Sequence, residues 1–218
     1  MLARIKAIIN IFRDYYYTKV RPKDSFIFQG ANYRYFYHSY NRTWRNERAV
    51  EIPIIRNIAK ENEAKTILEV GNVLSHYFHI DHDIIDKYEK AKAVINEDVV
   101  NFHPSKKYDL IISISTLEHV GWDEDPRDPS KVIRAIENLL ELLSPGGKII
   151  VTLPLGYNNE LDKFLKERRL ALDKQYYLKR ISKSNKWIET TWDDVCGAKY
   201  GKPFPNANAL IIGIIERK

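Results

Sequence analysis

The chain has 218 residues, 44% of them hydrophobic, which is enough for one compact domain with a full core. Its formal net charge of +6 is compatible with nucleic acid, anionic lipid or phosphorylated substrates and selects none of them. The single cysteine, Cys196, excludes an intramolecular disulfide framework and a cysteine-based metal cage. No apolar run approaches the roughly 18–20 residues of a membrane-spanning helix, and the first residues lack the pattern of a signal peptide, so we expect a cytoplasmic protein.

The first 20 residues carry apolar side chains at helical spacing. This apolar face consists of Leu2, Ile5, Ile8, Ile9, Phe12, Tyr15 and Tyr16. Arg4, Lys6, Arg13 and Lys19 flank it. Three interpretations are open: the helix packs on its own domain, it joins two copies as a homodimer, or it lies on a membrane surface.

Residues 26–45, FIFQGANYRYFYHSYNRTWR, are rich in aromatic and basic side chains and show no clean period. We expect a hairpin or an irregular cap whose rings pack on the core. Tyr and Trp interleaved with Arg can also stack on bases or on sugar faces. The predicted organisation is therefore an N-terminal helix and aromatic, basic cap over residues 1–50, followed by a main domain over residues 51–218.

The main domain begins with a predicted helix over residues 52–61, with Pro53 in its first turn. A first strand is expected over residues 65–70, and a second over residues 82–87, HDIIDK. Only about ten residues separate these strands, too few for a complete crossover helix. We expect one or two irregular turns there instead.

Further strands are predicted over residues 93–96, 108–115, 148–153 and 209–216, and a helix over residues 129–143. Residues 157–185 begin as a helix, and the last strand is expected to have a hairpin partner ending near Lys199 and Tyr200. Strands that alternate with helices indicate an α/β fold, Rossmann-like and doubly wound, with a mostly parallel sheet between two layers of helices.

The most informative segment is Thr66–Tyr77, TILEVGNVLSHY. Its apolar run ends in Glu69-Val70-Gly71, an acid and a glycine at the end of the first parallel strand. Many nucleoside-binding α/β folds begin in this way, because the glycine lets the backbone approach a ligand and the acid can hold a cationic or hydroxyl group.

Several motifs follow in a characteristic order. They are Ile84-Ile85-Asp86, Glu97-Asp98, Tyr108-Asp109-Leu110-Ile111, Leu117-Glu118-His119-Val120 and Leu143-Ser144-Pro145-Gly146-Gly147-Lys148. Together with Glu69-Val70-Gly71 they resemble the class I S-adenosylmethionine-dependent methyltransferases over about residues 66–155. The resemblance also implies a sheet whose last strand runs antiparallel, which suits residues 209–216, and makes residues 51–218 the methyltransferase domain.

The resemblance implies S-adenosyl-L-methionine as the cofactor and a role for each strand end. Glu69 is expected near the cationic amino-acid end, and Gly71 where the backbone approaches the ligand. Asp86 is expected to accept both ribose hydroxyls. Asp98 is expected to accept from the adenine amine, with Val99 packed on the ring. The neighbouring candidates for cofactor binding are Asn72, Lys87, Ser115 and Thr116.

The loop after the first strand departs from the family. Glycines usually occupy the two alternate positions after Gly71, and here these are Val73 and Ser75. A degenerate pocket in a non-catalytic, partner-binding domain is therefore an alternative. A nicotinamide dehydrogenase is disfavoured, because its G-x-G-x-x-G needs glycines that residues 71–76 do not supply beyond the first.

Methyl transfer requires a positioned nucleophile and, for a hydroxyl acceptor, a base. His119 follows the fourth strand and is the candidate general base, while Trp122 and Tyr157 are candidates for the acceptor pocket. Residues 115–119, STLEH, replace the Asn/Asp-Pro-Pro-aromatic loop that the family uses on amino groups of nucleobases. We expect an oxygen acceptor on a small molecule, glycan or lipid, with RNA and protein acceptors left open.

A histidine-rich run follows the first strand. It comprises His76, His79, Asp81, His82 and Asp83, with two overlapping His-x-x-His spacings. Imidazole and carboxylate suit zinc or iron. Because the run passes from a loop into a strand, its side chains should point in different directions, and we expect no metal site.

Overall fold

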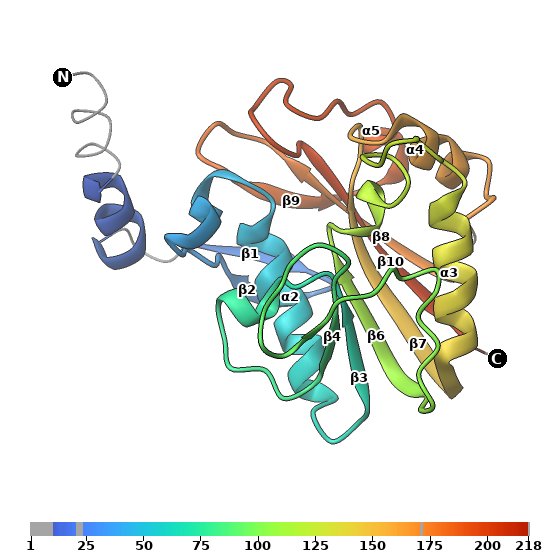
Figure 1. The fold of residues 1–218 in the computed structure, drawn as a ribbon. Helices are drawn as coiled ribbons and strands as arrows, with labels where there is room; N and C mark the ends of the chain where they lie inside the picture. The colour runs from blue at the N-terminus through green and yellow to red at the C-terminus, as the bar shows by residue number, and fades with distance from the viewer. Residues whose placement is uncertain (1–10, 21–23, 171, 218) are drawn as a thin grey trace.

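The computed structural model describes residues 11–20, 24–170 and 172–217, and an eight-stranded sheet forms its centre (Figure 1). The strand order is β5-β4-β3-β6-β7-β10-β8-β9. The bounds are β3 Ile67–Val70, β4 Asp83–Ile85, β5 Val94–Ile95, β6 Tyr108–Ile114, β7 Leu143–Pro154, β8 Lys174–Arg180, β9 Trp187–Thr190 and β10 Ala209–Glu216.

The sheet is parallel from β5 to β7, and β10 then pairs antiparallel with both β7 and β8. The chain starts at β3 in the middle, runs outward through β4 and β5, and returns to β6 on the other side of β3. The order therefore reverses between β3 and β6, which is where ligands bind in open α/β sheets. This arrangement confirms the predicted fold class, including the antiparallel C-terminal strand.

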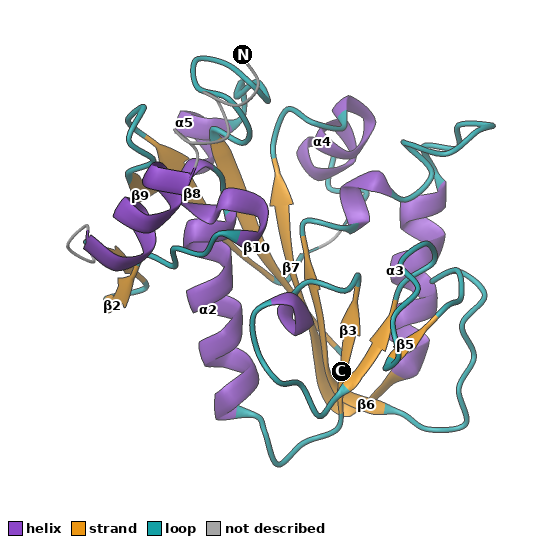
Figure 2. Ribbon diagram, turned by 60° about the vertical axis from the view of Figure 1, so that its left-hand side comes forward, coloured by secondary structure: helices purple, strands orange, loops and turns teal. Residues whose placement is uncertain are grey.

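Helices cover both faces of the sheet. Figure 2 shows α2 (Arg48–Glu61) on one side and α3 (Lys131–Leu142) on the other. The two shorter helices are α4 (Asn159–Lys166) and α5 (Trp192–Val195). Alternate residues of β6 point to opposite faces, so that Leu110 and Ile112 pack in the cluster of α2 while Ile111 packs in the cluster of α3.

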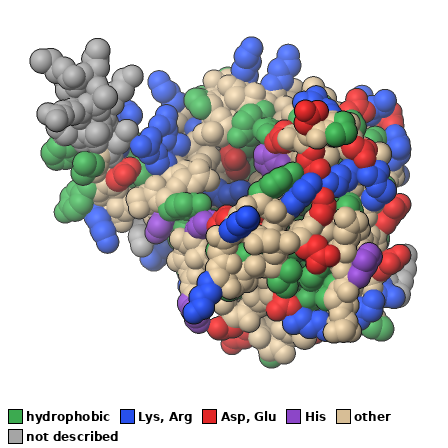
Figure 3. All heavy atoms as spheres, in the orientation of Figure 1, with side chains coloured by type: hydrophobic (Ala, Val, Ile, Leu, Met, Phe, Trp, Pro, Cys, Tyr) green, Lys and Arg blue, Asp and Glu red, His purple; other side chains and the backbone are tan. Residues whose placement is uncertain are grey.

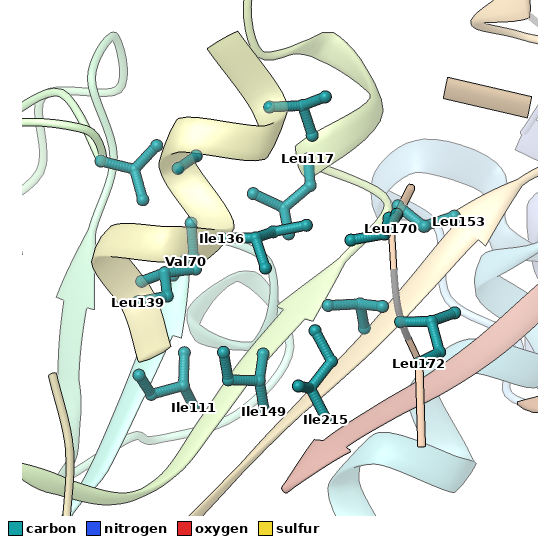
Figure 4. Packing of buried hydrophobic residues seen from close by; sticks show 14 of the residues in the cluster. Val70, Ile111, Leu117, Ile136, Leu139, Ile149, Leu153, Leu170, Leu172 and Ile215 are labelled. Atoms are coloured by element: carbon teal, nitrogen blue, oxygen red, sulfur yellow. The ribbon is translucent and has the colours of Figure 1, made fainter. Parts of the chain in front are cut away.

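The α3 side of the core is continuous across the sheet. Figure 4 shows Ile136 and Leu139 of α3 beside Ile111 of β6 and Ile149 of β7, with Ile215 of β10 next to them. All five are nearly or fully buried. The helical spacing of the apolar residues in α3 and the period of the strands thus meet in one apolar layer.

The N-terminal part forms a helix and a small cap. Residues 11–15 are helical and continue into a π-helical turn, η1 (Tyr16–Val20). The cap consists of the hairpin β1 (Ser25–Phe28) and β2 (Ala31–Arg34), followed by η2 (Tyr40–Arg45). Phe26, Phe28 and Tyr35 are buried in the same cluster as α2, so the rings of the cap pack on the core as expected.

The predicted apolar face of the first helix is only partly visible. Leu2, Ile5, Ile8 and Ile9 lie outside the described residues. Within residues 11–20, Phe12, Tyr15 and Tyr16 are exposed. None of the helices in the described part of the chain has the length and apolar character needed to span a bilayer.

Two parts of the fold can be compared directly with the sequence predictions: the connection between β3 and β4, and the partner of the last strand. Between β3 and β4 the chain forms only a 3₁₀ turn, η3 (Leu74–His76), as the short spacing predicted. The predicted hairpin partner of the last strand was wrong: β8, not the segment ending at Lys199 and Tyr200, pairs with β10. The basic sequence of β8, KQYYLKR, obscured its strand character, because only its last residues are buried.

Candidate functional site

A pocket of about 590 Å³ opens at the carboxyl ends of β3, β4, β5 and β6. Val70 and Ile85, the last residues of β3 and β4, contribute apolar surface to it. The other lining residues follow strand ends, namely Gly71, Asp86, Lys87, Tyr88, Glu89, Glu97, Asp98, Val99, Thr116, His119, Val120, Asp123 and Glu124. The pocket therefore lies at the point where the strand order reverses.

The lining of this pocket is acidic. It contains six carboxylates and one lysine, although the whole chain has a net charge of +6. Low-dielectric walls concentrate the field of such a group of charges. The pocket, which we call the acidic pocket, therefore favours a cationic ligand.

Gly71 packs closely against Thr116 where β3 and β6 end. Its φ is +85°, and a Cβ on it would lie 2.2 Å from Oγ1 of Thr116. Its backbone N–H donates to the carbonyl of Ile85 at 2.8 Å. Only glycine satisfies both the backbone conformation and the contact, so this position brings the loop after β3 directly against Thr116 in the loop after β6.

Asp86 ties the loops around the pocket together. Oδ1 accepts from the backbone N–H groups of Tyr88 and Glu89 at 2.9 and 2.8 Å, and Oδ2 accepts from that of Asn72 at 3.1 Å. A carboxylate has about four lone-pair positions, so one position on Oδ2 is left for a ligand. Asp86 can hold a hydroxyl while it shapes the loop, and Asn72 completes the loop by donating to Glu89 at 2.6 Å.

Glu69 does not line the pocket. Its carboxylate is fully buried, and Oε1 accepts from the N–H groups of Val73 and Leu74 at 2.9 and 2.8 Å. Oε2 pairs with Nε2 of His82 at 3.0 Å. In the structure, the acid that we expected beside the ligand instead fixes the path of the loop after β3.

The two positions without glycine do not obstruct the pocket. Val73 is buried in the cluster of α2, and Ser75 donates its hydroxyl to Oδ1 of Asn72. Neither residue lines the acidic pocket. The loop folds into η3 and the core instead of passing over the ligand site, so the departure from the family pattern changes the loop without filling the pocket.

Asp98 belongs to an ion network at one wall. Its Oδ2 binds Nζ of Lys131 at 2.6 Å and Nζ of Lys87 at 2.9 Å, and the same two lysines bind Glu124 at 2.6 and 2.9 Å. Partial burial acts to raise the pKa of Asp98, but the hydrogen bonds from the lysines outweigh it and lower the pKa. Val99 beside it is buried and presents apolar surface to the pocket.

His119 and Asp123 form a hydrogen-bonded pair on the pocket wall. Nδ1 of His119 lies 2.5 Å from Oδ2 of Asp123, and the hydroxyl of Tyr157 donates to the same oxygen at 2.6 Å. Partial burial acts to raise the pKa of Asp123, but the hydrogen bonds from Tyr157 and His119 prevail and lower it. An ionised Asp123 accepts the proton of Nδ1, which leaves Nε2 as the basic nitrogen.

Tyr157 supports this pair without lining the pocket itself. Its ring meets that of His119 edge-on at 4.7 Å, and burial followed by the bond to Asp123 raises the pKa of its hydroxyl. Trp122 also stays outside, with Arg127 4.2 Å above its ring. Asp123 was missed from the sequence, although its spacing of four residues from His119 was a usable signal.

Ser115 acts behind the pocket, not in it. It adopts a left-handed conformation with φ of +39°, which is unusual for a residue with a side chain. Its hydroxyl donates to Glu51 at 2.5 Å, and Thr152 donates to the same oxygen at 2.6 Å. Glu51 of α2, which sequence reasoning also missed, thus holds the turn that places Thr116 and His119.

Glu118 is a further buried acid that sequence reasoning did not assign. Burial raises its pKa well above the ordinary value, which favours the neutral form. Its Oε2 has no hydrogen-bond partner among the described residues, and its Oε1 lies 3.6 Å from Nε2 of His119. A carboxyl group therefore sits beside the basic nitrogen of the candidate base.

The histidine-rich run separates into pairs. His76 contacts Glu89 at 3.1 Å, His79 contacts Asp81 at 3.0 Å, and Asp83 accepts from Tyr108 at 2.7 Å. Across the described ranges, no three His, Cys, Asp or Glu side chains come together to hold a metal ion.

Among known proteins, similarity to this chain is found in the folds of solved structures and not in sequences. No protein-family model matches the chain, and no curated protein sequence matches it. The N-methyltransferase NodS from Bradyrhizobium japonicum, solved with S-adenosyl-L-homocysteine, is 13% identical, with a TM-score of 0.46 over 82% of this chain and 96% of that one. An rRNA methylase from Streptococcus thermophilus is 13% identical, with a TM-score of 0.44 over 77% and 97% of the two chains. TehB from Haemophilus influenzae is 15% identical, with a TM-score of 0.41 over 78% and 63%.

Proposed function

We propose that this chain is an S-adenosyl-L-methionine-dependent methyltransferase that binds its cofactor in the acidic pocket. The observation that carries the proposal is the charge of this pocket: six carboxylates and one lysine gather at the switch point of the sheet in a chain that is otherwise basic. A nucleotide bearing phosphates would be repelled there, whereas a nucleoside with a sulfonium and an amino group would be attracted.

Individual residues fit the parts of this cofactor. Asp86 has a lone-pair position left for a ribose hydroxyl, and Val99 and Ile85 offer an apolar surface to a base. The acids Asp123 and Glu97 supply negative charge for the cationic groups. Gly71 lets the loop after β3 approach Thr116 closely at the edge of the pocket, because any side chain there would overlap Thr116.

The chemistry follows from His119 and its partners. Bound S-adenosyl-L-methionine supplies an electrophilic methyl group. His119, held by Asp123, removes the proton of an acceptor hydroxyl through Nε2, and the negative charge of Asp123 stabilises the imidazolium that forms. The proposed acceptor is an oxygen of a small molecule, a glycan or a lipid, since a base is needed for a hydroxyl and not for a neutral amine lone pair.

The first experiment measures cofactor binding. Calorimetric titration with S-adenosylmethionine and S-adenosylhomocysteine is expected to show micromolar binding, and Asp86→Ala should weaken it about tenfold or more, since a hydrogen bond to a charged group contributes about 1.5–3 kcal/mol. Asp81→Ala is the matched control, because this exposed acid lies outside the pocket. Thermal unfolding of both variants separates a lost ligand contact from a lost loop.

Absence of binding to both compounds in the folded wild-type protein would contradict the proposal. The result would favour the second candidate, a non-catalytic domain of the same fold that binds a partner. The loop at Val73 and Ser75 argues against this candidate, because Val73 is buried in the core and neither side chain lines the acidic pocket.

The second experiment tests the base. Release of S-adenosylhomocysteine is measured with panels of hydroxyl-bearing small molecules, glycans and lipids, and with RNA and protein acceptors. His119→Gln should lower turnover on the active acceptor about 100-fold or more while cofactor affinity stays unchanged. An unchanged turnover would exclude His119 as the base, and activity on RNA or protein alone would overturn the acceptor class.

A further inference from the structure

A second, basic pocket lies on a different part of the molecule from the acidic one. Its volume is about 370 Å³, and it lies between residues 11–20, η2, the end of β8 and the segment before β10. We call it the basic pocket; it is lined by Arg13, Tyr17, Trp44, Arg45, Arg180, Lys183, Ser184 and Pro205. In Figure 1, residues 11–20 stand beside the cap.

The charge of the basic pocket has the opposite sign to that of the acidic pocket. Its lining contains four cationic side chains, Arg13, Arg45, Arg180 and Lys183, and no carboxylate. Figure 3 shows Lys and Arg side chains gathered where the N-terminal helix meets the body of the molecule. Four cations from three segments of the chain converge here at a cost of mutual repulsion, and an anion would lower that cost.

Arg180 is the most buried of the four. It is 5% exposed, and its guanidinium donates to the carbonyls of Pro205 at 2.7 Å, Arg45 and Ser182 at 3.1 Å, and Lys183 at 3.3 Å. These four bonds leave one of its five N–H donors. Carbonyl dipoles orient the guanidinium; burial and the nearby Arg45 lower its pKa, and Glu47, which does not line the pocket, offsets this only in part.

An aromatic wall completes the pocket. The rings of Tyr17 and Trp44 are stacked at 5.2 Å with an angle of 3° between them, and Trp44 is 4% exposed. The wall joins the N-terminal helix to the cap. It offers apolar surface beside the cations, which suits an anionic group attached to an organic portion.

We propose that the basic pocket binds the phosphate group of a phosphorylated ligand. Guanidinium groups match the oxygens of phosphate in a bidentate way, and Lys183 adds a mobile point charge. The organic part of the ligand packs against the half-buried ring of Tyr17, which Trp44 supports from behind. The shared chemistry is a phosphate ester, which comes from a soluble molecule or from a lipid head group; the exposed Ile11 and Phe12 beside Arg13 are placed to reach a bilayer in the second case.

The test uses the full chain and two charge-matched variants. The double variant Arg45→Gln, Lys183→Gln removes two exposed cations of the basic pocket, and the control Lys163→Gln, Lys166→Gln removes two exposed cations of α4. Glycerol 3-phosphate is titrated by calorimetry. Vesicles of phosphatidylcholine, with and without phosphatidylglycerol, are tested by sedimentation.

The wild type and the control should bind at least one of these probes about tenfold more tightly than the Arg45→Gln, Lys183→Gln variant. Binding of glycerol 3-phosphate assigns a soluble source. Binding of phosphatidylglycerol vesicles alone, weakened further by Phe12→Ser, assigns a lipid source. Failure of the wild type to bind either probe, or equal binding by the two double variants, overturns the proposal. Titration with S-adenosylmethionine should give the same affinity in both variants, because the basic pocket and the acidic pocket share no lining residue. The proposal for each pocket is therefore tested independently of the other.

Discussion

The two halves of the parallel sheet differ in how their strands are connected and stabilised. On one side, β6 and β7 are seven and twelve residues long and are joined by the apolar helix α3. On the other, β3, β4 and β5 have four, three and two residues and no α-helix joins them. The first, regular half is held by side-chain packing, and the second, irregular half by hydrogen bonds that backbone N–H groups donate to the carboxylates of Glu69 and Asp86.

The difference shows what a short strand needs to present a site. Glu69 and Asp86 together accept from the N–H groups of five residues in the loops after β3 and β4. Charge-assisted bonds of this kind are stronger than neutral ones. They replace the missing crossover helix, and they leave Asp86 and Gly71 at the edge of the acidic pocket.

The largest loss of stability is expected at Glu51, where α2 contacts the ends of β6 and β7 in the regular half. Glu51 is fully buried, pairs with Arg48 at 2.6 Å and accepts from Ser115 and Thr152. Glu51→Ala leaves the guanidinium unpaired and should lower the free energy of unfolding by about 3–5 kcal/mol. Urea denaturation measures it.

Glu61→Ala is the control on the same helix, because its carboxylate is exposed and accepts from the exposed side chain of Asn57, and a change within about 0.5 kcal/mol is expected. A loss below about 1 kcal/mol for Glu51→Ala would show that packing alone holds the turn at Ser115.

The second prediction tests the irregular half at Gly71. Gly71→Ala forces a left-handed φ on alanine and places its Cβ 2.2 Å from Thr116, and should lower the free energy of unfolding by about 2–4 kcal/mol. Gly30→Ala is matched in backbone, with φ of +73°, but has no atom within 4 Å of the added carbon. It should cost about 1 kcal/mol. Equal losses of unfolding free energy in the two variants would mean that the contact with Thr116 does not contribute to the cost of Gly71→Ala.

The two halves also differ in what the sequence reveals. The apolar periods of β6 and α3 predict their elements closely, because packing follows residue spacing, whereas β7 begins at Leu143 and not at Lys148 as predicted. At the site, Gly71 and Asp86 are found from their places at strand ends. Glu51, however, lies more than 60 residues before Ser115 in the chain, and no local sequence pattern predicts the hydrogen bond between them. Glu69 has the expected position along its strand, but only the folded loop shows that its carboxylate turns inward.

The third prediction concerns pH and the segment after β7. Asp162 accepts from the N–H of Gly156 at 2.8 Å, and burial raises its pKa to about 6. Because the folded state favours the protonated form, the stability from this group is present below the unfolded pKa, near 4, and is lost as pH rises through 6. Asp162→Asn keeps an acceptor and removes the charge.

The variant should therefore be more stable than the wild type at pH 7.5, by at most about 3 kcal/mol, with the difference vanishing near pH 4. Thermal unfolding between pH 4 and 7.5 measures this. A parallel pH dependence of the two proteins would contradict the raised pKa and would remove burial as the cause.

The smallest effect is expected at Lys87, the one lysine that lines the acidic pocket. Lys87 is exposed, and its partners Asp98 and Glu124 keep Lys131 at 2.6 Å without it. Lys87→Ala should therefore leave the thermal midpoint nearly unchanged and raise the affinity for S-adenosylmethionine about twofold to fivefold at low salt, because one cation leaves an otherwise negative lining. Lys90→Ala is the control, since Lys90 is exposed and does not line the pocket. A weaker affinity in Lys87→Ala would show that the irregular half needs this lysine to hold its loops, and that its carboxylates act on the backbone more than on the ligand.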